Sequence, residues 1–349
     1  MPKPSYVLTE EGVRKIQKRF CQKYEKPSFS QEDMAVEANL HRDTIRKLLN
    51  RTGGVNRKTL EDLCSPLDWD IENLTNGCDY ILRPPTIIGG RYTIIKHLGR
   101  GEFGDTYLSE DFSPTGKPQC VVIKQLSIQG SETAKKSQIR NVNALLSLNN
   151  HNKLLNNHNN QIAKLLHYFD EKDYLYLVYE FIQGNTLSQE LIEGQPWISS
   201  QVINMLQENL KILEFIHERN IIHRNINPKN LIRRSLDKKI ILINFSSLKE
   251  ISGGQTRTFA GTQGYMAPEQ ANGLAFACSD IYAVGTLGIQ AITGINPTQF
   301  KVNSEGKIIW RDKAKVNLKF ADILDKMVRY NFQERYQSAA DALQDFQNL

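Results

Sequence analysis

The stretch that decides the fold is His223-Arg224-Asn225-Ile226-Asn227-Pro228-Lys229-Asn230. Apolar residues at helical spacing predict a helix over 202–219 that leads into this stretch, and an apolar run at 240–243 follows it. Three of its eight residues are asparagines. An amide nitrogen is not basic at neutral pH, so the stretch offers polar side chains but no carboxylate that could accept a proton.

The composition is that of an ordinary globular protein. Hydrophobic residues make up 40% of the 349 residues and charged residues 23%. This length is enough for a two-lobed core with one small extra domain. The longest mostly apolar stretch, 281–292, is too short to span a bilayer and contains two glycines, so we expect a buried helix there.

Location and metal content are predicted from what the sequence lacks. Residues 1–6 contain no apolar run of the kind found in signal peptides. The five cysteines lie far apart and form no Cys-x-x-Cys pair. His151 and His158, in a polar tract, have no cysteine or carboxylate beside them. We therefore predict a cytoplasmic protein with no membrane association and no metal site.

Residues 1–82 are expected to form a small helical domain. Apolar spacing predicts helices over 9–24 and 42–50, a capping box at Ser30 opens a helix between them, and Leu60 marks a fourth. The second and third helices are separated by a short turn at Asn39. Helix, short turn and helix in this order resemble a helix-turn-helix domain.

The charge of this domain suggests a macromolecular partner. Residues 1–58 hold 13 Lys and Arg against 7 Asp and Glu, whereas residues 59–82 hold 6 acids and no base. DNA could be contacted through residues 41–51, with a nucleic-acid-binding set of Arg42, Thr44, Arg46, Lys47 and Arg51. We favour a protein partner slightly, because one small helix-turn-helix usually needs a dimer to bind DNA well. A solvated helical surface is the plain alternative.

Residues 83–90 form a proline-containing linker, and further motifs follow it in order. The glycine pattern Gly99-Arg100-Gly101-Glu102-Phe103-Gly104 lies between two predicted strands, and Val121-Val122-Ile123-Lys124 ends in a lysine. Asn244-Phe245-Ser246 follows the apolar run at 240–243. The segment at 261–269 reads Gly-Thr-Gln-Gly-Tyr-Met-Ala-Pro-Glu.

With the stretch at 223–230, these motifs resemble the Hanks-type Ser/Thr protein kinases of bacteria, in a cyanobacterial-like form, over residues 91–349. The resemblance implies an α+β, bilobal kinase-like fold preceded by the small all-α domain. It implies a structural pair between Glu269 and Arg335. It also implies that nucleotide would be contacted by Gly99, Gly101, Gly104, Lys124, Glu180, Ile182 and Asn230.

Four asparagines stand where the family has charged groups. Asn225 replaces the aspartate that accepts the substrate proton, and Asn227 replaces the catalytic-loop lysine. Asn244 replaces the aspartate that binds Mg²⁺, and Asn141, in a helix predicted over 132–148, replaces the glutamate that pairs with the strand lysine. A neutral amide is a poor ligand for Mg²⁺. The sequence therefore predicts no required cofactor and at most weak ATP binding without Mg²⁺.

Taken together, the sequence predicts a pseudokinase that is not an enzyme. It would act in signalling as a regulatory or scaffold protein that binds a macromolecular partner. Two alternatives stay open: a DNA-binding transcriptional regulator acting through residues 1–82, and a residual or unconventional Ser/Thr protein kinase.

Overall fold

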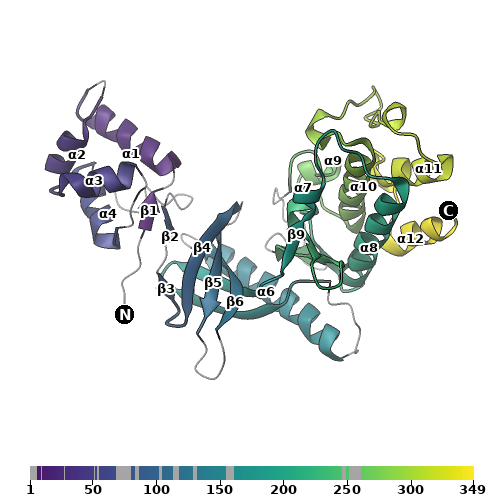
Figure 1. Cartoon of the computed structure of the whole chain (residues 1–349), viewed down its shortest axis with the longest axis horizontal. Coiled ribbons are helices and arrows are strands. Elements are labelled where there is room, and N and C mark those ends of the chain that lie inside the picture. Colours follow the sequence, from purple (N-terminus) through teal and green to yellow (C-terminus); the bar gives the residue numbers. More distant parts are fainter. Residues whose placement is uncertain are drawn as a thin grey trace. The chain divides into compact units, whose positions relative to one another are not determined.

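The computed structural model describes residues 6–8, 10–26, 28–50, 52, 55–67, 80–82, 86–101, 104–112, 118–128, 132–154, 161–245, 249–250 and 261–349. The chain divides into two compact units, each described by itself: residues 1–134 with 165–181, and residues 135–164 with 182–349. The first carries the N-terminal helices and a six-stranded sheet, and the second is mainly helical (Figure 1). The predicted α+β class is confirmed.

Four short helices open the first unit: α1 (Glu10–Lys23), α2 (Gln31–Glu37), α3 (Arg42–Leu49) and α4 (Arg57–Cys64). The predicted capping box starts α2: the Ser30 hydroxyl accepts the N–H of Asp33, and the Asp33 carboxylate accepts the N–H of Ser30. Asn39 has φ +50° in the turn between α2 and α3, a left-handed conformation that asparagine tolerates. The predicted order of helices and turn is therefore present.

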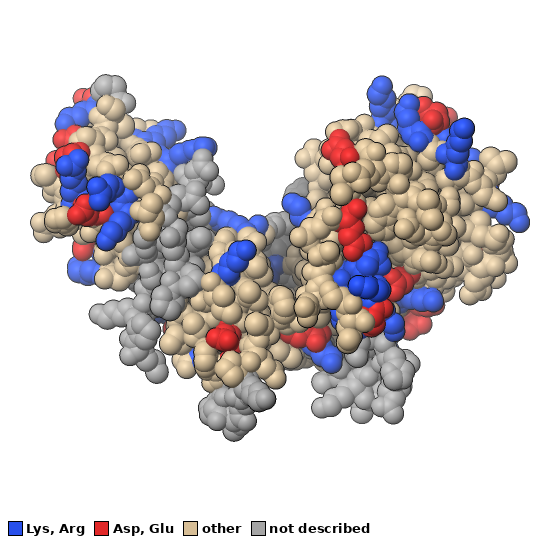
Figure 2. All heavy atoms as spheres, in the orientation of Figure 1, with Lys and Arg blue, Asp and Glu red and all other residues tan. Residues whose placement is uncertain are grey.

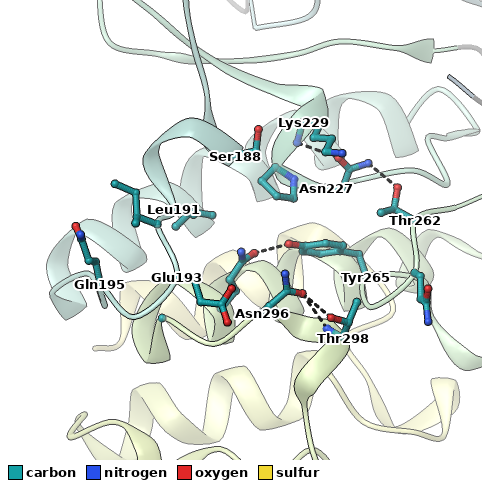
Figure 3. Close-up of a pocket in the computed structure, with 15 residues that line it drawn as sticks. Ser188, Leu191, Glu193, Gln195, Asn227, Lys229, Thr262, Tyr265, Asn296 and Thr298 are labelled. Carbon is teal, nitrogen blue, oxygen red and sulfur yellow. Dashed lines mark hydrogen bonds between the residues drawn. The ribbon is translucent and has the colours of Figure 1, made fainter. Parts of the chain in front are cut away.

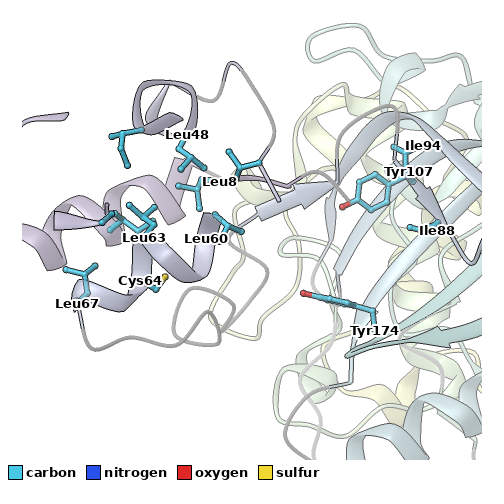
Figure 4. Packing of buried hydrophobic residues seen from close by; sticks show 14 of the residues in the cluster. Leu8, Leu48, Leu60, Leu63, Cys64, Leu67, Ile88, Ile94, Tyr107 and Tyr174 are labelled. Atoms are coloured by element: carbon cyan, nitrogen blue, oxygen red, sulfur yellow. The ribbon is translucent and has the colours of Figure 1, made fainter. Parts of the chain in front are cut away.

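Apolar residues of these helices face inward. Their side chains are almost fully buried, among them those of Ile16, Phe20, Met34, Ile45, Leu48, Leu60 and Leu63 (Figure 4). Each buried side chain of this size stabilises the fold by about 1.5–3 kcal/mol. The 3.6-residue spacing of these positions is what made the helices predictable.

Two very short strands were not predicted. β1 (Tyr6–Leu8) pairs antiparallel with β2 (Tyr80–Leu82), so that Tyr6 lies opposite Leu82. The pairing joins two segments that flank the four helices. Three residues are too few to show an alternating pattern, which explains why the sequence did not indicate them.

An antiparallel sheet follows, with the strand order β3-β4-β5-β6-β8-β7. Its strands are β3 (Ile87–Ile88), β4 (Tyr92–Gly101), β5 (Gly104–Asp111), β6 (Gln119–Ser127), β7 (Leu165–Glu171) and β8 (Tyr174–Glu180). β7 escaped prediction because its consecutive exposed residues, 166–168, break the alternation that marks a half-buried strand.

The two faces of β5 differ. Asp105, Tyr107 and Ser109 alternate as buried residues on one face, and Tyr107 lies among the buried side chains near Ile94 (Figure 4). Lys124 of β6 lies opposite Thr106 of β5 in the register, and so belongs to the other face. The period of two along β5 thus places Lys124 on the face away from Tyr107.

The second unit is built on helices α6 (Glu132–Leu154), α8 (Ser199–His217), α10 (Ala277–Thr293), α11 (Leu318–Met327) and α12 (Ala339–Gln347), with short helices α7 (Leu187–Glu190) and α9 (Pro268–Ala271). The first residues of α6 belong to the other unit. α6 continues to Leu154, beyond the predicted end at residue 148, through part of the polar tract. α8 packs against both α10 and α12.

The buried helix predicted at 281–292 is confirmed as the central part of α10. Its two glycines allow close packing: a Cβ on Gly285 would lie 2.7 Å from Cβ of Met327, and one on Gly288 would lie 2.9 Å from Cδ2 of Leu324. A glycine inside a helix costs about 0.5–1 kcal/mol relative to alanine. The close approach to α11 offsets that cost.

The stretch at 223–230 is held between short strands. α8 leads into β10 (Ile221–Ile222), which pairs with β13 (Lys249–Glu250). A 3₁₀ turn at Pro228–Asn230 closes the stretch and leads into β11 (Leu231–Arg234). β11 lies between β12 (Ile240–Leu242) and β9 (Gly184–Thr186) in a three-stranded sheet. Both ends of the loop are therefore fixed by backbone pairing.

Candidate functional site

The catalytic-loop stretch is anchored by the buried carboxylate of Asp280, at the start of α10. One oxygen of Asp280 accepts the backbone N–H of His223 and the other accepts that of Arg224, each at 2.8 Å. His217 lies 3.0 Å from the same carboxylate. Arg224 has φ +65°, a strained value for a residue with a side chain. The two charge-assisted hydrogen bonds hold the backbone in this conformation.

Asn225 and Asn227 form a hydrogen-bonded cluster with Thr262. Nδ2 of Asn227 donates to Oδ1 of Asn225 at 2.8 Å and to Oγ1 of Thr262 at 3.0 Å. The Thr262 hydroxyl in turn donates to Oδ1 of Asn225 at 2.7 Å. Asn225 is half-buried and Asn227 is buried. Sequence reasoning quoted Thr262 within a motif but gave it no role, because nothing in its spacing indicated this contact.

Asn230 and Asn244 extend the cluster. Nδ2 of Asn230 donates to the backbone oxygen of Asn225 at 2.8 Å, and Nδ2 of Asn244 donates to Oδ1 of Asn230 at 3.1 Å. Asn244 has φ +68°, which asparagine tolerates better than most residues. We call Asn225, Asn227, Asn230, Asn244 and Thr262 the amide cluster. The structure therefore brings together the sequence-predicted residues 225, 227, 230 and 244.

His223 joins the amide cluster to the following strand. Its Nε2 lies 3.1 Å from the backbone oxygen of Ile243, and its ring packs edge-on against Phe245 with 4.9 Å between centroids. Ser246, the third residue of that predicted motif, lies outside the described residues. The histidine thus acts as a spacer between the loop and residues 243–245.

The predicted pair between Glu269 and Arg335 is confirmed. Nη1 and Nη2 of Arg335 donate to the two carboxylate oxygens of Glu269 at 2.7 and 2.8 Å. Both side chains are buried, and the Ser279 hydroxyl also donates to Glu269. Nearby, burial raises the pKa of the Cys278 thiol to about 11, so this cysteine stays protonated at neutral pH.

A pocket of about 330 Å³ adjoins the amide cluster (Figure 3). Asn227, Lys229 and Thr262 line it together with Ser188 of α7, residues of the segment that follows α7, and residues at and after the end of α10. Its side chains are mostly uncharged, because Glu193 and Lys229 are the two charged residues among the lining. The carboxylate of Glu193 accepts a hydrogen bond from Gln299 at 2.9 Å. The pocket therefore suits a ligand with both polar and apolar parts and little net charge.

The predicted nucleotide-binding residues fall in both units. Lys124 is buried in β6, Gly99 and Gly101 lie in β4, and Gly104 begins β5. A Cβ on Gly104 would lie 1.8 Å from the backbone oxygen of Gln125, so only glycine fits there. Residues 102 and 103 of the glycine motif lie outside the described residues.

The remaining predicted residues of this set are placed separately. Glu180 ends β8 in the first unit, whereas Ile182, Asn230 and Asn141 belong to the second. Asn141 lies half-buried on α6. Lys124 and Asn141, which stand where the family has its lysine–glutamate pair, thus belong to different units.

Three of the basic residues predicted to contact nucleic acid, Arg42, Arg46 and Lys47, lie on α3 and are exposed. Arg42 pairs with Glu32 of α2 at 2.5 Å, and Arg46 pairs with Asp43 at 3.1 Å. Thr44 is half-buried, Lys47 is exposed, and Arg51 lies outside the described residues. Figure 2 shows Lys and Arg next to Asp and Glu over this part of the visible surface. The bases of α3 are therefore partly neutralised by neighbouring acids.

The residues that the structure describes contain no group of three or more His, Cys, Asp or Glu side chains that could hold a metal ion. None of their helices is both long and apolar enough to cross a bilayer. Of the two histidines weighed as metal ligands, His158 lies outside the described residues.

Comparison with known proteins identifies the family. The model of the protein kinase domain matches residues 92–346. The chain is 37% identical over 279 residues to Serine/threonine-protein kinase C of Synechocystis sp., covering 76% of this chain and 51% of that protein. It is 35% identical over 273 residues to Serine/threonine-protein kinase B of the same organism, covering 73% and 46%.

A third relative gives the same result. Serine/threonine-protein kinase PknA of Nostoc sp. is 32% identical over 272 residues, covering 75% of this chain and 48% of that protein. The chain thus spans about half the length of these curated relatives. Their cyanobacterial origin agrees with the form of the motifs.

These relatives overturn one prediction. The statement that the chain is not an enzyme is wrong, because the relatives that align over about three quarters of it are named Ser/Thr protein kinases. Sequence reasoning equated amides at Asn225, Asn227 and Asn244 with loss of all activity. Proton transfer supplies only part of an enzyme's rate, and substrate positioning supplies another large part without any carboxylate.

Sequence motifs, architecture and relatives agree over the same residues. The motifs at 99–124, 223–230, 244–246 and 261–269 all fall within the matched region, 92–346. That region holds every strand of the antiparallel sheet except β3, and the helices around α10. The chain belongs to the protein kinase family.

Proposed function

We propose that this chain is an unconventional Ser/Thr protein kinase that transfers phosphoryl groups slowly, through positioning more than through charge. The observation that carries the proposal is the built catalytic loop. Its backbone is anchored on Asp280, and its Asn225 side chain is held by Asn227 and Thr262. Strained backbone of this kind clusters at functional sites, and two charge-assisted hydrogen bonds hold Arg224 in it here.

The proposed reaction moves the terminal phosphoryl group of ATP to a serine or threonine hydroxyl. The bond between that phosphorus and ADP breaks, a bond to the hydroxyl oxygen forms, and the hydroxyl proton leaves to water. Asn225 can orient the hydroxyl but cannot take its proton. General-base catalysis contributes roughly 10²–10⁴-fold, so the rate falls by about that factor relative to an aspartate. Orientation of bound reactants, worth up to about 7–11 kcal/mol, is retained.

The resemblance to kinases implies Mg²⁺, and the residues present do not fit it. Asn230 Oδ1 already accepts the N–H of Asn244, and both groups are neutral amides. Mg²⁺ prefers carboxylate oxygens and gives up water reluctantly. We therefore derive no step through a metal ion and propose that nucleotide is held through the glycines around Gly104 and through Lys124.

A transfer assay tests this function. The full chain is incubated with terminally labelled ATP, with dephosphorylated casein as acceptor, in the presence of Mg²⁺, Mn²⁺ or a chelator. We expect slow label transfer that is lost in Lys124→Ala and kept in Lys96→Ala, an exposed lysine of the same sheet. Label transfer that is equal in Lys124→Ala and the wild type, or absent from both, would contradict the proposal.

The exposed bases of α3 support a second candidate function, the binding of a DNA duplex by the helical domain. Exposed ion pairs contribute only about 0–1 kcal/mol, so Arg42 and Arg46 can exchange their acidic neighbours for phosphates at little cost. Fluorescence anisotropy with a mixed-sequence duplex tests this idea.

Binding of the duplex should weaken with added salt and in Arg46→Ala/Lys47→Ala. It should persist in Lys58→Ala, a lysine of α4 that pairs with Asp62. No duplex binding at low salt would refute the DNA function and leave a protein partner for the helical domain.

A further inference from the structure

The orientation of the Asn225 side chain is fixed by a chain of hydrogen bonds that starts at the backbone. The N–H of Lys229 donates to one terminal atom of Asn227 at 2.9 Å. A backbone N–H can only donate, so that atom is Oδ1 and the other terminal atom is Nδ2. The nearby backbone oxygen of Asn225, 3.1 Å from Nδ2, agrees with this assignment because it can only accept.

The terminal oxygen and nitrogen of Asn225 are assigned in the same way. Nδ2 of Asn227 lies 2.8 Å from one terminal atom of Asn225, which must therefore be the acceptor Oδ1. The Thr262 hydroxyl donates to that oxygen as well. The remaining terminal atom of Asn225 is Nδ2, and it donates to no acceptor among the residues that the structure describes. Asn225 thus presents N–H groups at the position where an aspartate would present a second acceptor oxygen.

The charges around this amide favour an anion. Residues 223–230 contain Arg224 and Lys229 and no acid. Asp280, the carboxylate packed beneath the loop, already accepts two backbone N–H groups and lies beside His217. Lys229 is exposed and lines the adjoining pocket. An N–H group hydrogen-bonds more strongly to an ionised oxygen than to a neutral hydroxyl.

The residues that line the adjoining pocket indicate what kind of molecule carries the anion. Its lining combines polar and apolar residues and is nearly uncharged, and Glu193, its one carboxylate, is engaged by Gln299 (Figure 3). Such a lining accepts the backbone and side chains of a short peptide without requiring a charge on it. A phosphorylated serine or threonine carries about −1.5 to −2 charges at neutral pH and three acceptor oxygens.

We propose that Asn225 Nδ2 and Lys229 bind the phosphate of a phosphorylated serine or threonine side chain, whose peptide lies in the adjoining pocket. The inference rests on the proposed function for the source of this ligand, since it is the product of that reaction. Replacement of aspartate by a locked amide thus turns a site for a neutral hydroxyl into one that retains the phosphorylated product.

Titration calorimetry of the full chain without nucleotide tests the proposal. The probes are N-acetyl-O-phosphoserine N-methylamide, the same compound without phosphate, and inorganic phosphate. We expect phosphoserine to bind more tightly than inorganic phosphate, and unphosphorylated serine to show no binding. Equal affinity for serine and phosphoserine would overturn the proposal. Binding of inorganic phosphate alone would overturn its peptide part.

Variants of Asn225 test the donor itself. Hydrogen bonds to charged groups are worth about 1.5–3 kcal/mol, so Asn225→Ala should weaken phosphoserine binding by roughly 10-fold or more. Asn225→Asp replaces the N–H donor with a carboxylate that repels the phosphate, so phosphoserine should bind more weakly still. The control Asn317→Asp adds the same charge at the start of α11, where its oxygen still accepts the N–H of Lys319. Unchanged affinity in Asn225→Asp would overturn the proposal.

A negative result in this experiment can be distinguished from failure of the kinase proposal. It measures binding without turnover, so a wild-type chain that transfers no label could still bind phosphoserine. Conversely, a chain that transfers label but ignores phosphoserine would refute only the retention of product. Selective ¹⁵N labelling of asparagine adds a direct readout: the Asn225 amide resonance should shift on addition of phosphoserine, and no shift there would contradict the donor assignment.

Discussion

Two polar regions of the second unit differ in whether their side chains carry charge. Glu269 and Arg335 keep full charges and face each other through two hydrogen bonds of 2.7 and 2.8 Å. The amide cluster is less enclosed, because Asn225, Asn244 and Thr262 are half-buried. Its five members carry no charge and are joined by neutral hydrogen bonds. The Glu269–Arg335 pair is thus neutralised within the chain, whereas the amide cluster contains no charge that would need a partner from outside the chain.

The difference has a physical reason. A buried charge is tolerated when an opposite charge and hydrogen bonds satisfy it permanently, as in the Glu269–Arg335 pair. A carboxylate whose partner is a bound metal ion or a substrate hydroxyl has no partner while the site is empty. Amides can satisfy one another, as Asn244 does for Asn230. Apart from Nδ2 of Asn225, the amide cluster thus forms its hydrogen bonds within the chain.

The largest effect is expected from breaking the charged region. Glu269→Ala leaves the buried Arg335 unpaired and should lower the free energy of unfolding by about 3–5 kcal/mol. Denaturant unfolding measures this loss. The control is Glu334→Ala, whose carboxylate is exposed and 3.8 Å from Arg329, and which should change stability by less than about 1 kcal/mol. Equal losses in the two variants would show that the buried pair has no special role.

A smaller effect is expected from adding a charge to the amide cluster. Asn244→Asp removes the N–H that Asn230 Oδ1 accepts and supplies a carboxylate beside that oxygen. Without metal ions this variant should be less stable than the wild type by about 1–3 kcal/mol, because an acceptor loses its donor and faces a carboxylate. Saturating Mg²⁺ or Mn²⁺ should then stabilise it, by about 2.7 kcal/mol at 100 times the Kd.

Thermal unfolding with and without a chelator measures this response. The wild type and Asn317→Asp should not respond to these ions. A wild-type response as large as that of Asn244→Asp would show that the amides already bind metal.

The smallest effect is expected from loosening the amide cluster without a charge. Thr262→Val removes the hydroxyl that bonds to both Asn225 and Asn227, and should lower the free energy of unfolding by about 1 kcal/mol. Thr298→Val, which removes an exposed hydroxyl bonded to Asn296, serves as the comparison and should cost less. If Thr298→Val costs more, the hydroxyl of Thr262 does not stabilise the amide cluster.

Much of the fold could be predicted because periodicity and ordered motifs are local signals. The helix at 281–292 and the Glu269–Arg335 pair follow from a long apolar run and from motif positions in a known family. The pairing of β1 with β2 could not be predicted, because three-residue strands carry no pattern. The length of α6 was missed because its last turns are polar.

The candidate site was predictable as a set of residues but not as an arrangement. The positions of Asn225, Asn227 and Asn244 follow from the motifs, whereas the direction of the Asn225 amide depends on Thr262 and on the backbone of Lys229. A sequence shows which atoms are present and not which way they face. The same residues led to the prediction that the chain is not an enzyme, which the relatives named as Ser/Thr protein kinases contradict.

The most direct test of the account is the phosphoryl-transfer rate of Asn225→Asp. If the amide limits an otherwise assembled kinase, the variant should transfer label from ATP roughly 10² to 10⁴ times faster than the wild type. The gain should vanish when Lys124→Ala is added. A rate unchanged from the wild type, or a gain that survives the loss of Lys124, would contradict the account.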